Sequence, residues 1–282
     1  MATVKMGSNF PAQVSAEIFN KVKGHSSLAK LSRQSPIPFT GSTTFTFSMD
    51  GDISIVAEGG EKPDGGFTVA PVTVQPIKVM YQGRVSNEFL YAADEVRLNM
   101  MQAWINGAAI KFGQGLDKMA MHGVNPATNT NSPLITSHLD KAQKITLTNN
   151  PEADLEDAIA ALGDNDYNGV ALSKTFGASL GKLKENGVSQ YPEFRLGGQP
   201  EALAGVACDV NSTIAPVGAY VGDFQNAFKY GYGKDIQFEV IEYGDPDGKG
   251  DLKRTNEVCL RAEAFIGFGV LDLSSFARIA GE

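Results

Sequence analysis

The residues best placed for chemistry are one serine, three histidines and two glycine-rich or acidic runs. Gly177-Ala-Ser-Leu-Gly181 matches the G-x-S-x-G pattern, in which a strained strand-to-helix turn exposes a nucleophilic serine to a histidine base. Here the pattern begins inside a predicted helix. The three histidines are His25, His122 and His138. All of them precede Ser179, whereas hydrolases built on this turn carry the histidine last, so a serine hydrolase is disfavoured.

A second run, Tyr230-Gly-Tyr-Gly-Lys-Asp235, is similar in composition to a phosphate-binding loop. In such a loop, backbone N–H groups cradle the phosphates, a lysine reaches them and a Ser or Thr hydroxyl binds magnesium. Phe228 stands where the first glycine belongs, and Asp235 stands where the Ser or Thr belongs. The run is therefore expected to be a hairpin turn.

The acidic run Asp245-Pro-Asp-Gly-Lys-Gly-Asp251 has alternating carboxylates that could converge on a calcium ion. An EF-hand loop needs an oxygen ligand at its fifth position and a bidentate glutamate at its twelfth. This chain has Lys249 and Asn256 at those positions. We expect a solvated turn between two strands, residues 236–243 and 257–269.

The remaining candidates for metal or thiol chemistry lack partners. Cys208 and Cys259 have neither zinc-site spacing nor a disulfide framework, so each is expected to be a small buried hydrophobic residue. His122 lies beside Gly123 at a predicted helix end, where a cation favours the helix dipole, but one histidine is not a metal site. The sequence predicts no catalytic, cofactor-binding or metal-binding residue, and the chain is not expected to be an enzyme.

The composition indicates a folded protein without a strong preference for nucleic acid. The chain has 282 residues, 42% hydrophobic and 20% charged, which is enough for one large or two medium domains with a core. The formal net charge is -8 and no run of Lys and Arg stands out, so strong nucleic-acid binding is disfavoured. No membrane span and no signal-peptide core are present. We expect the chain to work in the cytosol or in something assembled there.

The elements that must position any site begin with a long projection. Residues 43–49 and 53–56 are predicted strands, followed by paired glycines and prolines that oppose a helix. Apolar and polar residues then alternate through 67–82, with a slip at Pro76 that suits an edge strand or a bulge. Residues 43–82 are thus predicted to form a long, projecting two-stranded hairpin with a glycine-rich tip. A lone hairpin is marginal in water, so a neighbouring subunit is expected to supply its packing surface; the alternative is an ordinary surface hairpin of a monomer.

A long helix is predicted over residues 85–123. Ser86 is the predicted N-cap of a short first segment, Asp94 lies near a second start, and Gly123 is the predicted stop. Interior glycines indicate bending or close packing. The apolar stripe has steps of three and four residues and consists of Met101, Ile105, Ala108, Phe112, Leu116 and Met119.

The rest of the chain mixes helices and strands without strict alternation, which favours an α+β fold. Residues 1–40 are predicted as a short helix and an extended arm, and residues 122–150 as loops. Further helices are expected at 152–162 and, with Ser173 as N-cap, from there to about 183. Further strands are expected at 169–172, 204–209, 219–222, 236–243 and 257–269.

The order of these elements resembles tailed-phage major capsid proteins of the Hong Kong 97 type. The glycine-rich loop, alternating strand and helix of residues 56–123 resemble that family's extended loop and spine helix. Gly169-Val-Ala-Leu-Ser-Lys-Thr-Phe176 and Leu203-Ala-Gly-Val-Ala-Cys-Asp209 are similar to strands of its axial domain. Leu183-Lys-Glu-Asn-Gly-Val-Ser-Gln-Tyr191, Gly222-Asp-Phe224 and the run 260–272 with 276–279 also match. The resemblance covers about residues 15–280 and rests on order and spacing.

The resemblance implies a Hong Kong 97-type fold in five parts. These are an N-terminal arm (1–42), an extended β-hairpin loop (43–84), a peripheral domain with the spine helix (85–150), an axial domain (151–255) and return strands to the peripheral domain (256–282).

The same resemblance implies a major capsid protein of a tailed bacteriophage. Such proteins assemble into pentamers and hexamers of an icosahedral shell around double-stranded DNA. Expected partners are further copies of the chain, together with a scaffolding protein, a portal and a decoration protein. DNA would be enclosed without sequence-specific binding, no membrane would be involved, and the virion would be assembled in the host cytoplasm. The alternatives are an encapsulin-type nanocompartment shell and, from another class, a soluble enzyme or binding module.

Some members of the family join their subunits by an isopeptide bond between a loop lysine and an asparagine, helped by a glutamate. Asn256 and Glu263 match the last two by their position in the chain. The lysine position falls near Thr68 or Val69, with Lys62 and Lys78 on either side, so the cross-link is not expected. The long N-terminal segment that serves some relatives as a scaffold is also lacking. We therefore expect either a separate scaffolding protein or a processed form.

Overall fold

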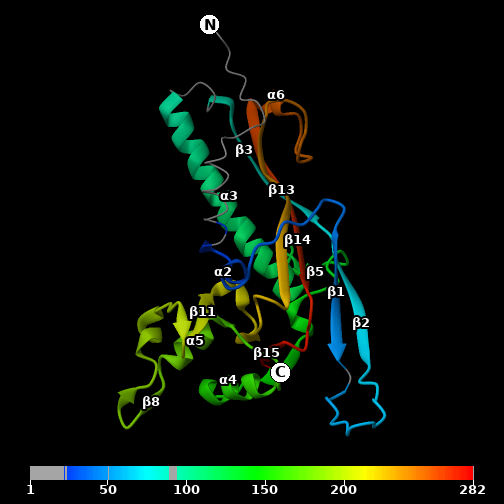
Figure 1. The fold of residues 1–282 in the computed structure, drawn as a ribbon. Helices are drawn as coiled ribbons and strands as arrows, with labels where there is room; N and C mark the ends of the chain where they lie inside the picture. Colours follow the sequence, from blue (N-terminus) through cyan, green and yellow to red (C-terminus); the bar gives the residue numbers. More distant parts are fainter. Residues whose placement is uncertain (1–21, 23, 50, 89–93, 282) are drawn as a thin grey trace.

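The computed structural model describes residues 22, 24–49, 51–88 and 94–281, and shows an α+β protein with a separate projecting hairpin (Figure 1). Predictions for residues 1–21, which include the start of the arm, lie outside this range. So does the segment 89–93, where the short first helix was expected. Among the described residues, no helix has the length and hydrophobicity that a membrane span requires.

A six-stranded mixed sheet forms one end of the molecule. Its strands, in spatial order, are β10 (Ala202–Leu203), β11 (Val206–Asn211), β7 (Gly169–Ser173), β12 (Ala219–Gly222), β15 (Phe276–Ala280) and β6 (Gln143–Thr146). Helices α4 (Pro151–Ala160) and α5 (Lys174–Leu180) pack on it. Side chains alternate along β7, so that Val170 and Leu172 contact these helices while Ala171 joins the core on the other face.

A three-stranded antiparallel sheet forms the other end. It consists of β13 (Phe228–Ile241), β14 (Glu257–Val270) and β3 (Ile77–Ser86), with β14 in the middle. Helix α3 (Asp94–His122) packs against β14. The ring of Trp104 on α3 lies between Tyr81 of β3 and Phe238 of β13, with ring centroids 6.1 and 6.0 Å apart. One face of the sheet is thus covered by the helix, and the other carries charged side chains such as Arg261 and Glu263.

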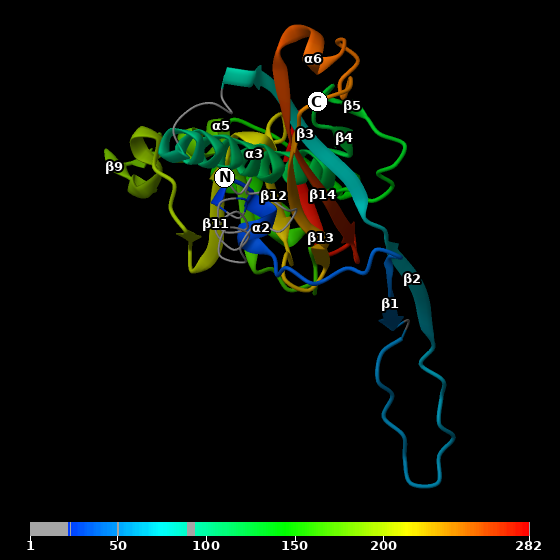
Figure 2. The ribbon, with the colours of Figure 1, turned by 90° about the horizontal axis from the view of Figure 1, so that it is seen from above.

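The hairpin consists of β1 (Ser42–Met49) and β2 (Phe67–Val74), paired from Ser42↔Val74 to Met49↔Phe67. The expectation of a projecting hairpin is confirmed for these strands, and Figure 2 shows it reaching away from the body. The expectation is wrong for residues 53–56, which are not part of a strand: Ile53 is 99% exposed, and no strand among the described residues pairs with this segment. It is also wrong for residues 77–82, because the chain changes sheets after Pro76 and β3 pairs with β14.

The long helix is confirmed from Asp94 to Gly123, which follows α3 with φ +68° as a helix stop. Ser86 ends β3, and its Oγ accepts a hydrogen bond from the Glu88 N–H at 3.3 Å where a 3-10 turn begins at residue 87, which agrees with its predicted capping role. The indicated close packing is found at Gly113, where a Cβ atom would lie 2.7 Å from the Val22 carbonyl oxygen.

Three further predictions need correction. The run 230–235 is not a turn but part of β13, because its residues continue the ladder with β14 through two register shifts. Helix α5 ends at Leu180 rather than near 183, since the chain turns sharply at Gly181, whose Cβ would lie 2.8 Å from the Phe194 carbonyl oxygen. Strand β6 was not expected; its four residues are mostly exposed and carry little apolar alternation.

Several short elements complete the fold. Asn150 caps α4, Ser173 caps α5 as predicted, and residues 236–243 and 257–269 lie largely in β13 and β14. The short elements are α2 (Ser27–Leu31), β4 (Val124–Asn125), β5 (Thr130–Asn131), η2 (Leu139–Lys141), β8 (Lys184–Glu185), β9 (Val188–Ser189), η3 (Pro192–Gly197), η4 (Ser212–Ile214) and α6 (Leu252–Thr255).

The chain between α2 and β1 crosses the three-stranded sheet over glycines. Ser35 donates its N–H to the Tyr230 carbonyl, and a Cβ atom at Gly231 would lie 1.7 Å from the Ser35 carbonyl oxygen. Farther along, Ile37 and Val74 occupy the space above Gly267 and Gly269. A side chain at Gly231 would collide with the backbone of the arm, and at Gly267 and Gly269 it would displace Ile37 and Val74, so the base of the hairpin packs closely on the body.

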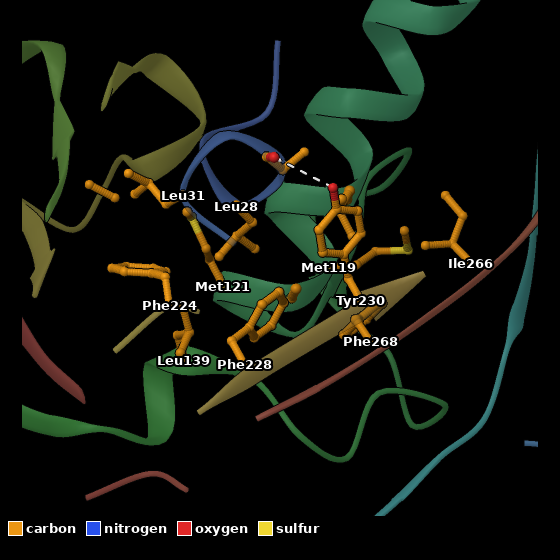
Figure 3. Packing of buried hydrophobic residues seen from close by; sticks show 14 of the residues in the cluster. Leu28, Leu31, Met119, Met121, Leu139, Phe224, Phe228, Tyr230, Ile266 and Phe268 are labelled. Atoms are coloured by element: carbon orange, nitrogen blue, oxygen red, sulfur yellow. Dashed lines mark hydrogen bonds between the residues drawn. The ribbon is translucent and has the colours of Figure 1, made fainter. Parts of the chain in front are cut away.

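The largest core lies where α2, α3 and β13 meet (Figure 3). Leu28 and Leu31 of α2 pack beside Met119 and Met121 at the end of α3, and the Tyr230 hydroxyl donates a hydrogen bond to the Ala29 carbonyl at 3.4 Å. The same cluster contains residues of both sheets, including Ala171, Tyr220, Ala262 and Ile266. The two sheets therefore share one continuous hydrophobic core.

Candidate functional site

The serine and histidines of the first motif do not form a nucleophilic site. Ser179 lies within α5, not on a strand-to-helix turn, and its Oγ donates to the Thr175 carbonyl at 3.1 Å. Within the described ranges, no hydrogen bond joins Ser179 to a histidine. His122 instead lies 3.0 Å from a carboxylate oxygen of Asp140.

Neither cysteine is placed for chemistry. Cys208 lies in β11 and Cys259 in β14, both buried and free. Burial raises the pKa of the Cys208 thiol to about 12, so it remains a thiol at neutral pH. In the part of the chain that the structure describes, no group of three or more His, Cys, Asp or Glu side chains could hold a metal ion.

The acidic run of residues 245–251 folds back on an arginine. The Arg84 Nε lies 3.0 Å from both carboxylate oxygens of Asp247, and its Nη1 donates to Glu257 Oε2 at 3.1 Å. Its Nη2 donates to the Gly250 carbonyl at 2.8 Å. The hydrogen bonds between Arg84 and Asp247 lower the pKa of the carboxyl and raise the pKa of the guanidinium. The expected turn between strands is confirmed, but a guanidinium organises it, which could not be predicted because Arg84 lies 161 residues before Asp245 in the chain.

A buried carboxylate fastens α2 to the long helix. Asp117 is fully buried and accepts hydrogen bonds from Ser26 Oγ at 2.6 Å, Thr213 Oγ1 at 2.7 Å, and the N–H groups of Ser27 and Leu28 at 2.9 and 3.2 Å. Burial raises its pKa to about 6, although these donors oppose the shift. Sequence reasoning missed this residue because its hydrogen-bond donors are distant in the chain. The one available signal was that Asp117 interrupts an otherwise apolar helix face.

A second carboxylate fastens α2 to the six-stranded sheet. Asp209 of β11 accepts from Ser27 Oγ at 2.5 Å and from Lys30 Nζ at 2.5 Å. Together with Asp117, it ties the five-residue helix to both halves of the body. These two contacts join the arm to the body without any catalytic geometry.

His122 belongs to a polar cluster between the end of α3 and the six-stranded sheet. Its Nδ1 lies 3.0 Å from Asp140 Oδ2, and its Nε2 lies 3.0 Å from the Thr213 carbonyl oxygen. The Tyr220 hydroxyl donates to Asp140 Oδ1 at 2.7 Å, and Arg278 Nη1 lies 3.3 Å from the same oxygen. Burial opposes a charge on His122, but the Asp140 carboxylate prevails and raises its pKa. Since both ring nitrogens face acceptors, the imidazolium form satisfies them together.

The residues of the possible cross-link lie apart. Glu263 in β14 pairs with Lys78 of β3, with Nζ and Oε1 3.1 Å apart. Asn256 follows α6 with φ +57°, at the opposite end of β3, beside Asn87. Lys62 lies exposed in the hairpin tip. Among the residues that the structure describes, Lys78 contacts the glutamate, and no hydrogen bond joins a lysine to Asn256.

The most unusual surface of the molecule is the apolar face of the β1–β2 hairpin. Strand register places Phe45 opposite Pro71, Phe47 opposite Val69, and Met49 opposite Phe67. Because side chains alternate, all six lie on one face, while Thr44 and Thr46 lie on the other. Phe47 is 64% exposed and Met49 is 75% exposed. A projecting ribbon with one apolar face indicates a protein–protein contact.

Comparison with known proteins agrees with this reading. The profile described as "Phage capsid family" matches residues 7–281. A solved structure from Mycobacterium phage Ogopogo has 29% identity and a TM-score of 0.80, covering 92% of each chain. One from Gordonia phage Cozz has 22% identity and a TM-score of 0.75, covering 91% of this chain and 87% of that chain.

A more distant likeness extends over the whole chain. The capsid of an empty GTA particle has 15% identity and a TM-score of 0.64, covering 100% of this chain and 95% of that chain. A search of curated proteins gave no match. The family match spans nearly the entire sequence, and the phage structures share its fold. The chain therefore belongs to the phage capsid family.

Proposed function

We propose that this protein is the major capsid protein of a tailed bacteriophage and that many copies form the icosahedral shell of the virion around double-stranded DNA. The observation that carries the proposal is the apolar face of the hairpin on a chain of the phage capsid family. Such a face is unstable in water by itself and is stabilised by a neighbouring copy. The family match does not favour the nanocompartment alternative.

The shell consists of pentamers and hexamers, built by heterologous contacts. The hairpin is one partner of each contact, and a different surface of the next copy is the other. A contact between unlike surfaces closes into rings when its rotation fits. The parts of the subunit are the arm (1–42), the hairpin loop (43–84), the peripheral domain (85–150), the axial domain (151–255) and the return strands (256–282).

The protein acts mechanically and not as an enzyme. Ser179 Oγ donates to the Thr175 carbonyl within α5, and both cysteines are buried in strands, so the described environments of these residues fit a structural role. With a formal net charge of -8, the chain encloses DNA without sequence-specific binding. Assembly in the host cytoplasm with a scaffolding protein, a portal and a decoration protein follows from the same role.

Expression of the full chain in bacteria, followed by negative-stain electron microscopy and sedimentation, tests the proposal. Closed shells, tubes or rings are expected, if necessary after co-expression of the phage's own scaffolding protein. A homogeneous monomer or dimer under both conditions would contradict the proposal.

A further inference from the structure

The sequence contains three Asn-Gly pairs, Asn106-Gly107, Asn168-Gly169 and Asn186-Gly187. An asparagine before glycine is chemically labile, because a glycine nitrogen without a neighbouring Cβ atom reaches the asparagine Cγ and displaces the side-chain amide. The attack requires a backbone N–H that is free of hydrogen bonds and a peptide that rotates out of regular secondary structure. The fold therefore decides which of the three pairs reacts.

Two of the pairs are held in regular structure. Asn106 lies in the middle of α3, where each backbone N–H donates to the carbonyl four residues earlier. The side chain of Asn168 donates a hydrogen bond to Asp223 and accepts one from the Phe224 N–H at 3.0 Å. Gly169 is buried in β7, between β11 and β12. Reaction at either pair requires that α3 or the six-stranded sheet open first.

The third pair forms the turn of the β8–β9 hairpin, which Figure 1 shows at the edge of the molecule, beyond α5. Asn186 and Gly187 have φ values of +50° and +81°, the conformation for which a two-residue hairpin loop favours Asn-Gly. Both are exposed, and a Cβ atom at Gly187 would meet nothing within 4 Å. Within the described part of the chain, the Asn186 amide makes no hydrogen bond to another residue. The turn is thus fully open to water.

The ladder that holds this turn is short. β8 and β9 are joined by the pairs Lys184↔Ser189 and Glu185↔Val188, and below them the Gln190 N–H donates to the Leu183 carbonyl at 3.2 Å. A hairpin of this length is marginal in water, and it opens without disturbing either sheet. The Gly187 nitrogen is therefore released for attack while the rest of the subunit stays folded.

We propose that Asn186 is a site of spontaneous deamidation in the folded protein, whereas Asn106 and Asn168 are protected. The Gly187 nitrogen forms a bond to Asn186 Cγ and gives its proton to water, and the Cγ–Nδ2 bond breaks so that the amide nitrogen leaves as ammonia. Water then opens the resulting five-membered imide at either carbonyl and gives aspartate or isoaspartate. One water is consumed and one ammonia is released, with no change in oxidation state.

The product alters both the charge and the backbone of the hairpin. It adds one negative charge to a chain whose formal net charge is -8. In the isoaspartyl form, the backbone gains one methylene group at the turn, which the two-residue loop between β8 and β9 does not accommodate. Copies of the chain therefore become heterogeneous with age at one exposed loop. The inference does not depend on the proposed function.

Peptide mass spectrometry of the aged protein tests the proposal. The wild type is incubated in mildly alkaline buffer made with oxygen-18 water, folded and, in parallel, unfolded in guanidinium chloride. In the unfolded chain, all three asparagines should convert at similar rates. In the folded protein, Asn186 should convert on the order of ten-fold or more faster than Asn106 and Asn168, because only its turn opens locally. Equal rates at the three sites of the folded protein, or an Asn186 as slow as the other two, would overturn the proposal.

Glutamine variants give an independent readout on the whole protein. Asn186→Gln retains the amide but would have to form a six-membered ring, so the acidic species that appears on ion exchange during ageing should be lost. Asn106→Gln is the matched control and should age like the wild type, while Asn186→Asp marks where the acidic species elutes. Circular dichroism checks that each variant is folded. An acidic species that persists in Asn186→Gln would place the reaction elsewhere and contradict the assignment.

Discussion

At the residue scale, the body is held together by carboxylates that meet donors from distant parts of the chain. Asp117 and Asp209 bind α2, Asp140 binds His122 and Tyr220, and Asp247 binds Arg84. Each of these acids lies in a different element from its partner. A sequence read in windows gives no signal of such pairs, because the residues are brought together only by the fold.

Asp117 should leave a mark on the pH dependence of stability. Its pKa in the folded chain is about 6, above its ordinary value, so the folded state binds the proton more tightly than the unfolded state. Its contribution to the free energy of unfolding therefore falls as pH rises from about 4 to about 6. The loss is about 3 kcal/mol, because a pKa difference of about two units corresponds to that free energy. Denaturant unfolding of the wild type and Asp117→Asn across this range measures it, since asparagine does not titrate. A constant difference between the two proteins would contradict the assignment.

His122 should affect stability at higher pH than Asp117, and its charged form is a cation rather than an anion. Its pKa is raised, so the stability it contributes is present below its ordinary pKa and is lost as pH rises through the raised value. We expect the free energy of unfolding to decline through this window in the wild type but not in His122→Gln. An NMR titration of the imidazole gives the folded pKa directly. A value below that of an unstructured peptide would refute the charged form.

At the element scale, the long strands and helices were predictable, together with those boundaries that a capping residue marks. Periodicity predicted α3 and β14, and caps predicted the start of α5 at Ser173 and the end of α3 at Gly123. Alternation could not show that the chain leaves the hairpin and enters the three-stranded sheet at Pro76, because side chains alternate in the strands of both sheets. The first part of β13 was also missed, because Gly231 and Gly233, which allow the close approach of the arm, interrupt the alternation there.

Two glycines of α3 distinguish the effect of packing on stability from the effect of helix propensity. A methyl group at Gly107 meets nothing within 4 Å, whereas at Gly113 it would lie 2.7 Å from the Val22 carbonyl oxygen. Gly107→Ala should therefore stabilise the protein by about 0.5–1 kcal/mol, and Gly113→Ala should destabilise it. Thermal unfolding of the two variants, each a one-methyl change on the same helix, measures both effects. Stabilisation by Gly113→Ala would show that the chain around Val22 is not held against α3.

At the scale of the whole molecule, the subunit is a shared core from which one unsupported element projects. The two sheets and α3 bury their apolar faces against one another, while the hairpin leaves its apolar face in solvent. The projecting hairpin could be predicted from its strand pattern and glycine-rich tip, but its apolar face could not, since the register that joins Phe45, Phe47 and Met49 of β1 to the facing residues of β2 comes only from the fold.

The apolar face should be required for assembly and dispensable for folding. Each phenylalanine buried at a contact contributes about 1.5–3 kcal/mol, so Phe45→Thr with Phe47→Thr should abolish or strongly weaken assembly. The monomer's unfolding should hardly change, because both side chains are already exposed. Thr44→Ser with Thr46→Ser alters the other face of the same strand and is the control.

Electron microscopy of these three proteins under identical conditions tests the central claim most directly. The account predicts closed particles for the wild type and the threonine-face variant, and folded, unassembled subunits for the phenylalanine variant, with circular dichroism confirming the fold. Particles of normal size and yield from the phenylalanine variant would contradict it.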